Sequence, residues 1–163
     1  MSGYVGERIE NWVEQTVEEW MGLEINQTKT QIVDLKERRS SLDFLGYTFR
    51  YEESRYRGKP RFLTMVPSAK ACKRERQRIK ELTSRRWNAR PVNEVVEKLN
   101  RQVKGWSNYF DQGRNRPAMR GMNSYIYKRM WKHLSRRSQR GYKPPKGQSW
   151  YEHLRNDLEV IYL

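Results

Sequence analysis

The sequence predicts an α+β protein that is mainly α, with a small antiparallel β segment followed by three helices. Short runs rich in β-branched and aromatic residues lie before Pro67, whereas after it apolar residues recur every three to four positions, as in amphipathic helices. The charge divides at the same place, with a net of −1 for residues 1–66 and +16 for residues 67–163, which sum to the +15 of the chain. We therefore expect two domains with these bounds.

One helix and three strands are expected before Pro67, at residues 5–21, 31–35, 42–50 and 61–66. In the helix, seven apolar side chains recur at helical spacing, and Gly22 stands where a glycine C-cap would end it. The last two strands are expected to pair as an antiparallel hairpin, through a polar turn that holds Gly58 and Pro60.

Three helices are expected after Pro67, at residues 69–86, 92–110 and 118–136. Ser68 is the expected N-cap of the first helix. In the second helix, six apolar side chains fall within about 80° of one another at 100° per residue. They are Val92, Val96, Leu99, Val103, Trp106 and Phe110. His133 belongs to the inner face of the third helix, and a linker then leads to a short helix at 148–158 and a terminal strand or tail.

The surplus of basic residues predicts a polyanionic partner. From residue 112 to residue 151 the chain has eleven Lys/Arg and no Asp or Glu, and six Tyr or Trp residues are interleaved with these bases. A solvated face or a disordered tail is the alternative explanation for such a run. The aromatic residues favour a folded surface that binds nucleic acid.

The same composition argues against several other classes of function. No apolar run approaches the roughly 20 residues that span a bilayer, so no membrane partner is expected. Cys72 is the only cysteine, which excludes an intrachain disulfide and fits the reducing cytoplasm, the expected location. The acidic residues are mostly isolated, and His133 and His153 have no partner at metal-ligand spacing. We therefore expect no metal site, no cofactor and no enzymatic activity in the isolated chain.

Four motifs resemble, in the same order, segments of one family. LEINQTKT at 23–30 and LDFLGYTF at 42–49 resemble the end of the polymerase palm of group II intron-encoded reverse transcriptases. LNRQVKGWSNYF at 99–110 is similar to their maturase-specific motif, and the segment 136–163 is similar to the carboxy terminus of the bacterial members. The chain thus resembles the C-terminal part of a bacterial-type group II intron reverse transcriptase/maturase.

This resemblance implies a residual palm segment at 1–66 and a thumb/maturase-specific RNA-binding domain at 67–163, folded as a three-helix bundle. Lys29 matches the lysine of polymerase motif D, which lies near the phosphates of the incoming nucleotide. The residues that match the primer-grip hairpin are Phe44, Leu45, Gly46 and Tyr47. The expected RNA-binding residues are Lys98, Asn100, Arg101, Lys104, Asn108, Arg136, Arg137, Arg140 and Lys143. Asn100 and Asn108 are candidates for hydrogen bonds to RNA or to loop backbone, whereas core packing is expected for Trp106 and Phe110.

The partners that the resemblance implies are intron RNA and a template–primer duplex. In the family, the Tyr-x-Asp-Asp metal motif precedes the segment that matches here, and this motif is not present in the sequence. Our first interpretation is therefore a truncated maturase that assists splicing without polymerase chemistry of its own. The alternative is a subunit of a split RNA-directed DNA polymerase, completed in trans by an upstream fragment that carries this motif; Mg²⁺ would then be the cofactor, and Lys29 would contribute to catalysis. A third interpretation is a DNA-binding or nucleic-acid chaperone role, for which the sequence holds no helix-turn-helix or zinc-finger pattern.

Overall fold

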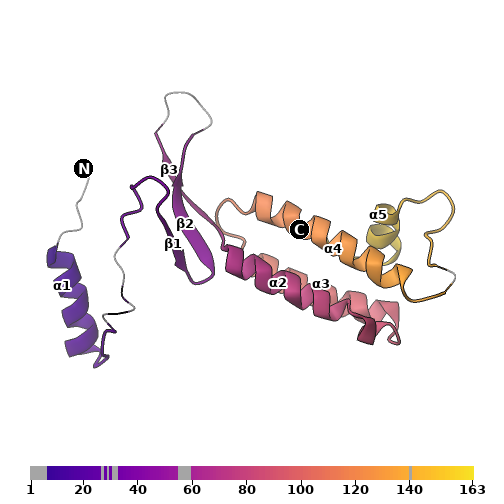
Figure 1. Cartoon of the computed structure of the whole chain (residues 1–163), viewed down its shortest axis with the longest axis horizontal. Helices are drawn as coiled ribbons and strands as arrows, with labels where there is room; N and C mark the ends of the chain where they lie inside the picture. The colour runs from indigo at the N-terminus through magenta and orange to yellow at the C-terminus, as the bar shows by residue number, and fades with distance from the viewer. Residues whose placement is uncertain (1–6, 27, 29, 31–32, 55–59, 140) are drawn as a thin grey trace. The chain divides into compact units, whose positions relative to one another are not determined.

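The computed structural model describes residues 7–26, 28, 30, 33–54, 60–139 and 141–163. The chain forms two compact units, Met1–Asp34 and Leu35–Leu163. Among the described residues, the first unit holds one helix and the turn that continues it, and the second holds a three-stranded sheet and the remaining helices (Figure 1). This content confirms the predicted α+β, mainly α class.

The helix of the first unit, α1 (Glu7–Gln15), continues into a π-helical turn, η1 (Thr16–Trp20). Gly22 follows with φ +64°, a left-handed conformation that glycine adopts readily at the end of a helix. The predicted helix and its C-cap are therefore confirmed for the described residues. Several large apolar side chains of this unit are exposed; they are Ile9, Trp12, Val13, Trp20, Met21 and Leu23.

The strand predicted at 31–35 is wrong for the residues that the structure describes. Val33 and Asp34 have no regular secondary structure, and Leu35 begins a turn, while Gln31 and Ile32 lie outside the described residues. A strand requires a neighbouring strand that supplies its hydrogen bonds. The described sheet begins only at residue 41, so the apolar pattern of this segment is not sufficient to form one.

The second unit begins with an antiparallel sheet of order β1-β2-β3 (Ser41–Phe44, Tyr47–Glu52 and Phe62–Pro67). β3 pairs with β2, as predicted for the hairpin. The single strand predicted at 42–50 is wrong, because the chain reverses within it and β1 pairs with β2. Of the predicted turn between β2 and β3, Gly58 lies outside the described residues.

The reversal occurs at Leu45-Gly46, where both residues have positive φ (47° and 82°), as type I′ hairpin turns require. Glycine adopts this conformation at no steric cost, whereas it costs a side-chain-bearing residue such as Leu45 about 1–2 kcal/mol. Apolar and aromatic residues continue on both sides of the turn. For that reason the local pattern predicts one strand where the structure has two.

The register of the sheet places a row of apolar residues on one face. Leu42, Phe49 and Met65 lie opposite one another in the three strands. Phe44 and Leu63 are each two positions from a member of this row, so they belong to the same face. Their exposed fractions are 58% and 52%, so this face is partly open to solvent.

Ser68 caps α2 (Ala69–Leu82), its hydroxyl accepting a backbone N–H of the first turn at 3.1 Å, as predicted. The helix is one turn shorter than predicted. Its end is held by Arg129, whose guanidinium donates to Thr83 Oγ1 at 2.9 Å and to the Thr83 carbonyl oxygen at 3.2 Å. Backbone carbonyls at a helix end need such partners, and a 3₁₀ turn, η2 (Arg85–Trp87), follows.

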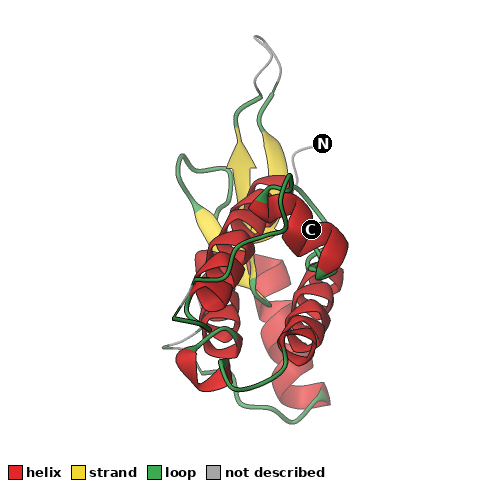
Figure 2. Cartoon of the chain, turned by 90° about the vertical axis from the view of Figure 1, so that its right-hand side faces the viewer, coloured by secondary structure: helices red, strands yellow, loops and turns green. Residues whose placement is uncertain are grey.

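α3 (Val92–Tyr109) and α4 (Arg116–Ser135) begin and end within two residues of the predicted bounds. With α2 they form a three-helix bundle (Figures 1 and 2). Its core consists of the inward stripes of the three helices; the buried apolar residues are Ile79, Val96, Leu99, Val103, Trp106, Phe110, Met119, Met122, Ile126, Met130 and Leu134. Trp106 and Phe110 are thus core residues, as predicted.

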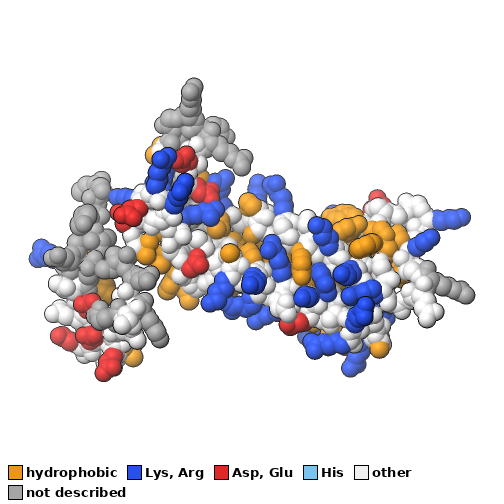
Figure 3. Space-filling view, in the orientation of Figure 1, with side chains coloured by type: hydrophobic (Ala, Val, Ile, Leu, Met, Phe, Trp, Pro, Cys, Tyr) orange, Lys and Arg blue, Asp and Glu red, His pale blue; other side chains and the backbone are white. Residues whose placement is uncertain are grey.

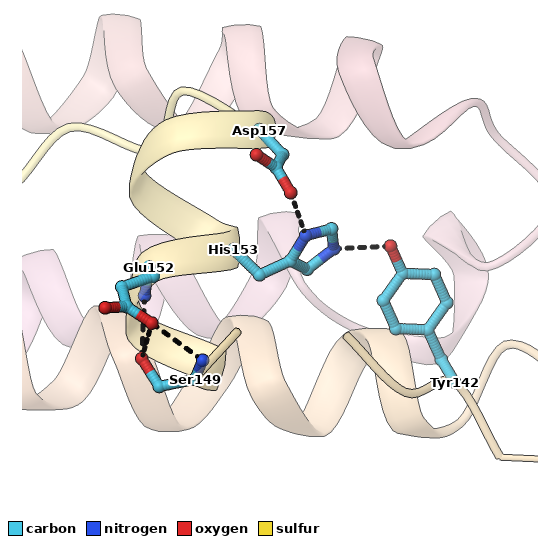
Figure 4. Close-up of polar contacts among 5 residues, drawn as sticks. All are labelled: Tyr142, Ser149, Glu152, His153 and Asp157. Carbon is cyan, nitrogen blue, oxygen red and sulfur yellow. Dashed lines mark hydrogen bonds and ion pairs between the residues drawn. The ribbon is translucent and has the colours of Figure 1, made fainter. Parts of the chain in front are cut away.

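The segment after α4 ends in a short helix, α5 (Trp150–Glu152), followed by a π-helical turn, η3 (His153–Asp157). Ser149 begins this helix with a capping box (Figure 4). Leu154 and Val160 complete the core, with exposed fractions of 0% and 2%. Of the two predicted alternatives for the last residues, the structure has the tail and not the strand.

The charge boundary at Pro67 predicts that the sheet and the helices belong to separate domains, but backbone hydrogen bonds join them. The Ser68 N–H donates to the Gly46 carbonyl at 2.8 Å, and the Arg114 N–H donates to the Met65 carbonyl at 3.0 Å. The division between compact units accordingly falls before Leu35 and not at the charge boundary. The expected domains 1–66 and 67–163 remain a prediction about function.

Candidate nucleic-acid interface

A groove of about 900 Å³ runs between α2 and α3 and reaches the β1–β2 turn. Four of its lining residues are basic; they are Arg74, Arg78, Lys98 and Arg101. Residues 35–163 carry thirty-two Lys/Arg and twelve Asp/Glu, whereas residues 1–34 carry two and seven. Figure 3 shows Lys and Arg side chains gathered over the helices of the second unit. A groove whose rim carries one sign of charge concentrates an anionic partner.

The helical spacing of these bases explains why they share one groove. Arg74 and Arg78 are one turn apart on α2, and Lys98 and Arg101 are three residues apart on α3, so each pair lies on one side of its helix. The Lys98 ammonium lies 3.3 Å from a Glu94 carboxylate oxygen, with 44% of the lysine side chain exposed. An exposed ion pair of this kind is worth at most about 1 kcal/mol, so the lysine remains able to bind phosphate.

The β1–β2 turn lies at one end of the groove and is held there by two tyrosines. The Tyr47 hydroxyl donates to the Tyr109 carbonyl at 2.6 Å, and the Tyr109 hydroxyl donates to the Leu45 carbonyl at 2.7 Å. Burial, with Tyr109 nearby, raises the pKa of Tyr47, which keeps its phenol protonated as a donor. A Cβ at Gly46 would lie 3.4 Å from the Phe110 ring. The predicted primer-grip residues therefore form a tightly fastened turn beside α3, in which Phe44 and Leu45 are exposed and Gly46 and Tyr47 are half-buried.

The floor of the groove contains polar side chains that are cut off from solvent. Glu75 is 1% exposed, and its Oε2 accepts a hydrogen bond from Gln102 Nε2 at 2.8 Å. Burial raises the pKa of Glu75, against the opposing effects of Gln102 and Arg78. Glu75 Oε1 and the Trp106 indole N–H have no hydrogen-bond partner among the described residues. Such atoms are few in native proteins, and each requires an explanation.

Two of the predicted RNA-binding residues, Lys98 and Arg101, lie in this groove. Lys104 and Asn108 are exposed on the same helix but do not line the groove, and Lys143 is exposed in the segment before α5. The predicted site residues that lie outside the described residues are Lys29 and Arg140. The structure thus brings together only part of the predicted set.

Asn100 and Arg136 make contacts within the protein. Asn100 Nδ2 donates to the Glu159 carbonyl at 2.8 Å, and its Oδ1 accepts from the Ile161 N–H at 2.9 Å. Asn100 therefore holds the C-terminal tail, which is the loop-backbone role that the sequence left open. Arg136 donates to the Thr83 carbonyl at 2.9 Å, at the end of α2.

Arg137, another predicted RNA-binding residue, lies beside a buried histidine. Its guanidinium is 3.4 Å from His133 Nε2, and the histidine has no exposed surface. Burial, together with the positive charges of Arg137, Arg136 and Arg129, lowers the pKa of His133 to about 4. His133 is therefore neutral at pH 7 and is a packed histidine, as its place on the inner face predicts.

The sequence analysis does not identify Arg74, Arg78, Glu75 and Gln102 as site residues. One signal was available, because Glu75 lies one helical turn before the buried Ile79, on a stripe where an apolar residue is expected. An acid at such a position indicates a buried polar contact. Its partner cannot be deduced locally, since Gln102 belongs to a different helix.

A second polar cluster lies in the C-terminal segment (Figure 4). His153 Nδ1 is 2.7 Å from Asp157 Oδ2, and His153 Nε2 is 2.6 Å from the Tyr142 hydroxyl. A carboxylate that orients a histidine also occurs in catalytic triads. Here the residue that carries the ring is only 5% exposed and its second partner is a phenol, so the cluster fastens the linker after α4 to η3.

Among the described residues, no three or more His, Cys, Asp or Glu side chains are grouped so that they could hold a metal ion. In the same part of the chain, no helix combines the length and the apolar character needed to cross a membrane.

The fold and the groove define a basic, mainly helical protein of the kind typical of nucleic-acid binding. Residues 72–151 match the family model of the group II intron, maturase-specific domain. This part of the chain, from α2 to the start of α5, belongs to that family, which confirms the resemblance to the C-terminal part of a maturase. No curated protein matches the chain. Membership of this family implies a role in group II intron splicing, with intron RNA as the partner.

Proposed function

We propose that this chain binds structured RNA of a bacterial-type group II intron through the α2/α3 groove, in the cytoplasm, and assists splicing without polymerase chemistry of its own. One observation carries the proposal: the four basic residues of the groove all lie within the segment 72–151 that matches the maturase-specific domain. The basic rim of the groove is therefore built by the part of the chain that matches this domain, while Leu45 and Gly46 of the β1–β2 turn line its end.

The chemistry of the groove suits a phosphate backbone. Arginine presents two parallel N–H donors that match the oxygens of a phosphate, and Arg74 and Arg78 are both exposed at the rim. Lys98 and Arg101 face them from α3. A strand of RNA that follows the groove would meet the β1–β2 turn at its end, where Leu45 is 68% exposed.

Fluorescence anisotropy of a labelled RNA stem-loop with the full chain tests this proposal. If about six to ten phosphates are neutralised, the affinity should fall about 10³–10⁵-fold between 50 and 200 mM salt, because bound counterions are released from the RNA. A flat salt titration would contradict a phosphate-based interface.

A matched pair of double variants tests the groove itself. Arg74→Gln with Arg78→Gln should lower the affinity and reduce the salt slope by about 2, since each lost phosphate contact reduces it by about 1. Arg116→Gln with Arg120→Gln is the control: both residues are exposed and one turn apart on α4, and neither lines the groove. Equal effects of the two pairs would show that overall charge, and not the groove, binds the RNA.

The second candidate function is a subunit of a split RNA-directed DNA polymerase that grips template–primer duplex. It is favoured by the exposed side chains of Phe44 and Leu45 in the turn at the end of the groove and by the exposed apolar side chains of α1 and η1, which a palm fragment could cover. Alone, the chain should extend no primer with any divalent metal, because the clamping carboxylates are supplied by the other fragment. Adding a polypeptide with the fingers and the Tyr-x-Asp-Asp motif should restore extension; if it does not, this candidate is wrong.

A further inference from the structure

The floor of the α2/α3 groove offers one hydrogen-bond acceptor and one donor that have no partner in the described part of the chain. Glu75 Oε1 is the acceptor, and the Trp106 indole N–H is the donor. Both residues line the groove and are more than nine-tenths buried, with exposed fractions of 1% and 8%. An unpaired buried polar atom is unfavourable. Two of opposite kind in one groove indicate a ligand that presents both a donor and an acceptor.

Gln102 holds the Glu75 carboxyl group in place. Its Nε2 donates to Glu75 Oε2 at 2.8 Å, which leaves Oε1 as the available acceptor. Gln102 and Trp106 lie one turn apart on α3, so they approach the groove from the same side. Glu75, which Gln102 holds, and Trp106 therefore line the same groove, and Gln102 and Trp106 reach it from one side of α3.

The charge of the groove further restricts the ligand. The rim carries two arginines from α2 and a lysine and an arginine from α3, so it suits an anion. A phosphate at the floor would meet the Glu75 carboxylate, which repels it. The ligand must therefore be anionic at the rim and uncharged, with hydrogen-bonding groups, at the floor. A nucleotide has this division, but in a duplex the base edges are paired and stacked, so the base must be unpaired.

We infer that the α2/α3 groove binds an unpaired nucleotide whose base carries an exocyclic amino group. The amino group donates to Glu75 Oε1, and a ring nitrogen of the base accepts from the Trp106 indole N–H. Adenine and cytosine carry an amino donor next to an acceptor, whereas the N3–H donor of uracil lies between two carbonyl oxygens that a carboxylate repels. This inference rests on the proposed RNA binding and names the part of the RNA that reaches the floor.

Single-stranded RNAs of equal length test the inference by fluorescence anisotropy with the full chain. The probes are oligo(A), oligo(C), oligo(U) and an abasic ribose-phosphate strand. Oligo(A) and oligo(C) should bind about fivefold or more tightly than oligo(U), the smallest discrimination expected of a specific base contact. Oligo(A) and oligo(C) should also bind more tightly than the abasic strand, since that strand offers only the contacts of the rim.

Glu75→Gln separates the floor from the rim. The amide keeps the shape of the side chain but presents a donor as well as an acceptor, so the preference for oligo(A) and oligo(C) over oligo(U) should disappear. Glu81→Gln is the matched control, because Glu81 is an exposed acid on the same helix that does not line the groove. Gln102→Leu is a second variant: it frees the Glu75 carboxyl group and should therefore weaken the preference. Circular dichroism shows which variants are folded.

Equal affinities of the wild-type chain for the three oligonucleotides overturn the inference, as does a folded Glu75→Gln variant that keeps the preference. The RNA stem-loop distinguishes this failure from that of the proposed function. If the stem-loop still binds with steep salt dependence, the rim binds RNA and only the nucleotide pocket is wrong. If neither kind of probe binds, the proposed function fails as well.

Discussion

In the three-helix bundle, Leu99, Ile126 and Met130 have no exposed surface, whereas in the sheet Phe44 and Leu63 are more than half exposed. The two regions belong to one compact unit and are joined by hydrogen bonds between the β1–β2 turn and the end of α3. The bundle therefore covers its own apolar stripes. The sheet keeps an apolar face open, as expected of a segment that another surface covers.

The largest expected effect is a contrast between one core residue and one sheet residue. Ile126→Ala should lower the free energy of unfolding by about 2–5 kcal/mol, because it leaves a cavity between helices that cannot close. Phe44→Ala should change it by about 0.5 kcal/mol or less, as for other exposed positions. Urea denaturation followed by circular dichroism measures both, and comparable losses would mean that the sheet face is covered in solution.

A pH titration of stability tests how closed the bundle is around His133. Its folded-state pKa of about 4 lies below the ordinary value of 6.5, so the unfolded chain takes up the proton first as the pH falls. The contribution of neutral His133 to stability is fully present above pH 6.5. The free energy of unfolding should fall by about 3 kcal/mol as the pH falls from 6.5 to about 4. Replacing His133 with Leu should remove this part of the pH dependence. Parallel curves for the two proteins would show that the ring is accessible to water.

Gly113 tests the loop that joins α3 to α4 and contacts the sheet. A Cβ at this position would lie 2.3 Å from the Met65 carbonyl oxygen, and φ is +88°. Gly113→Ala should therefore cost more than about 2 kcal/mol, since the clash adds to the roughly 1–2 kcal/mol of the left-handed conformation. Gly147→Ala is the matched control, with φ +87° and no atom within 4 Å among the described residues. If thermal melts show that the two variants lose the same stability, the loss comes from the backbone conformation alone and not from the contact with β3.

The smallest expected effect concerns the tyrosine that fastens the β1–β2 turn. Tyr109→Phe removes the hydrogen bond to the Leu45 carbonyl and should cost about 1 kcal/mol. Hydrogen exchange should show faster exchange of the amides at 42–49, with those of α3 unchanged, because opening of the sheet is local. Tyr151→Phe, at an exposed position of α5, should change neither set. If the amides at 42–49 are as protected as those of α3 in the wild-type chain, the sheet is as stable as the bundle and the comparison fails.

Local signals account for the parts of the fold that the sequence predicts well. The apolar periodicity of α3 and α4, the Ser68 cap and the Gly22 cap are properties of neighbouring residues, and the structure confirms them. The β1–β2 turn is mispredicted because Leu45 is held at positive φ by a hydrogen bond from Tyr109, a residue far along the chain. No pattern around Leu45 contains that contact.

The site divides in the same way. Arg101 belongs to the motif at 99–110 and Lys98 stands directly before it, but the bases across the groove, Arg74 and Arg78, come from another helix. Asn100 belongs to the same motif, yet its amide holds the C-terminal tail. Membership of a motif thus points to a helix without predicting which of its sides lines the groove.

The sequence by itself determined the mainly helical class, the basic character of the region after residue 66 and the resemblance to a maturase, since these depend on composition, periodicity and the order of motifs. Only the tertiary structure decided that the sheet belongs with the helices, which bases share a groove, and that Glu75 lies at its floor. The physical reason is that these relations join residues distant in the chain. They are determined by how the helices pack against one another, and helix packing depends on shape complementarity that a local pattern does not encode.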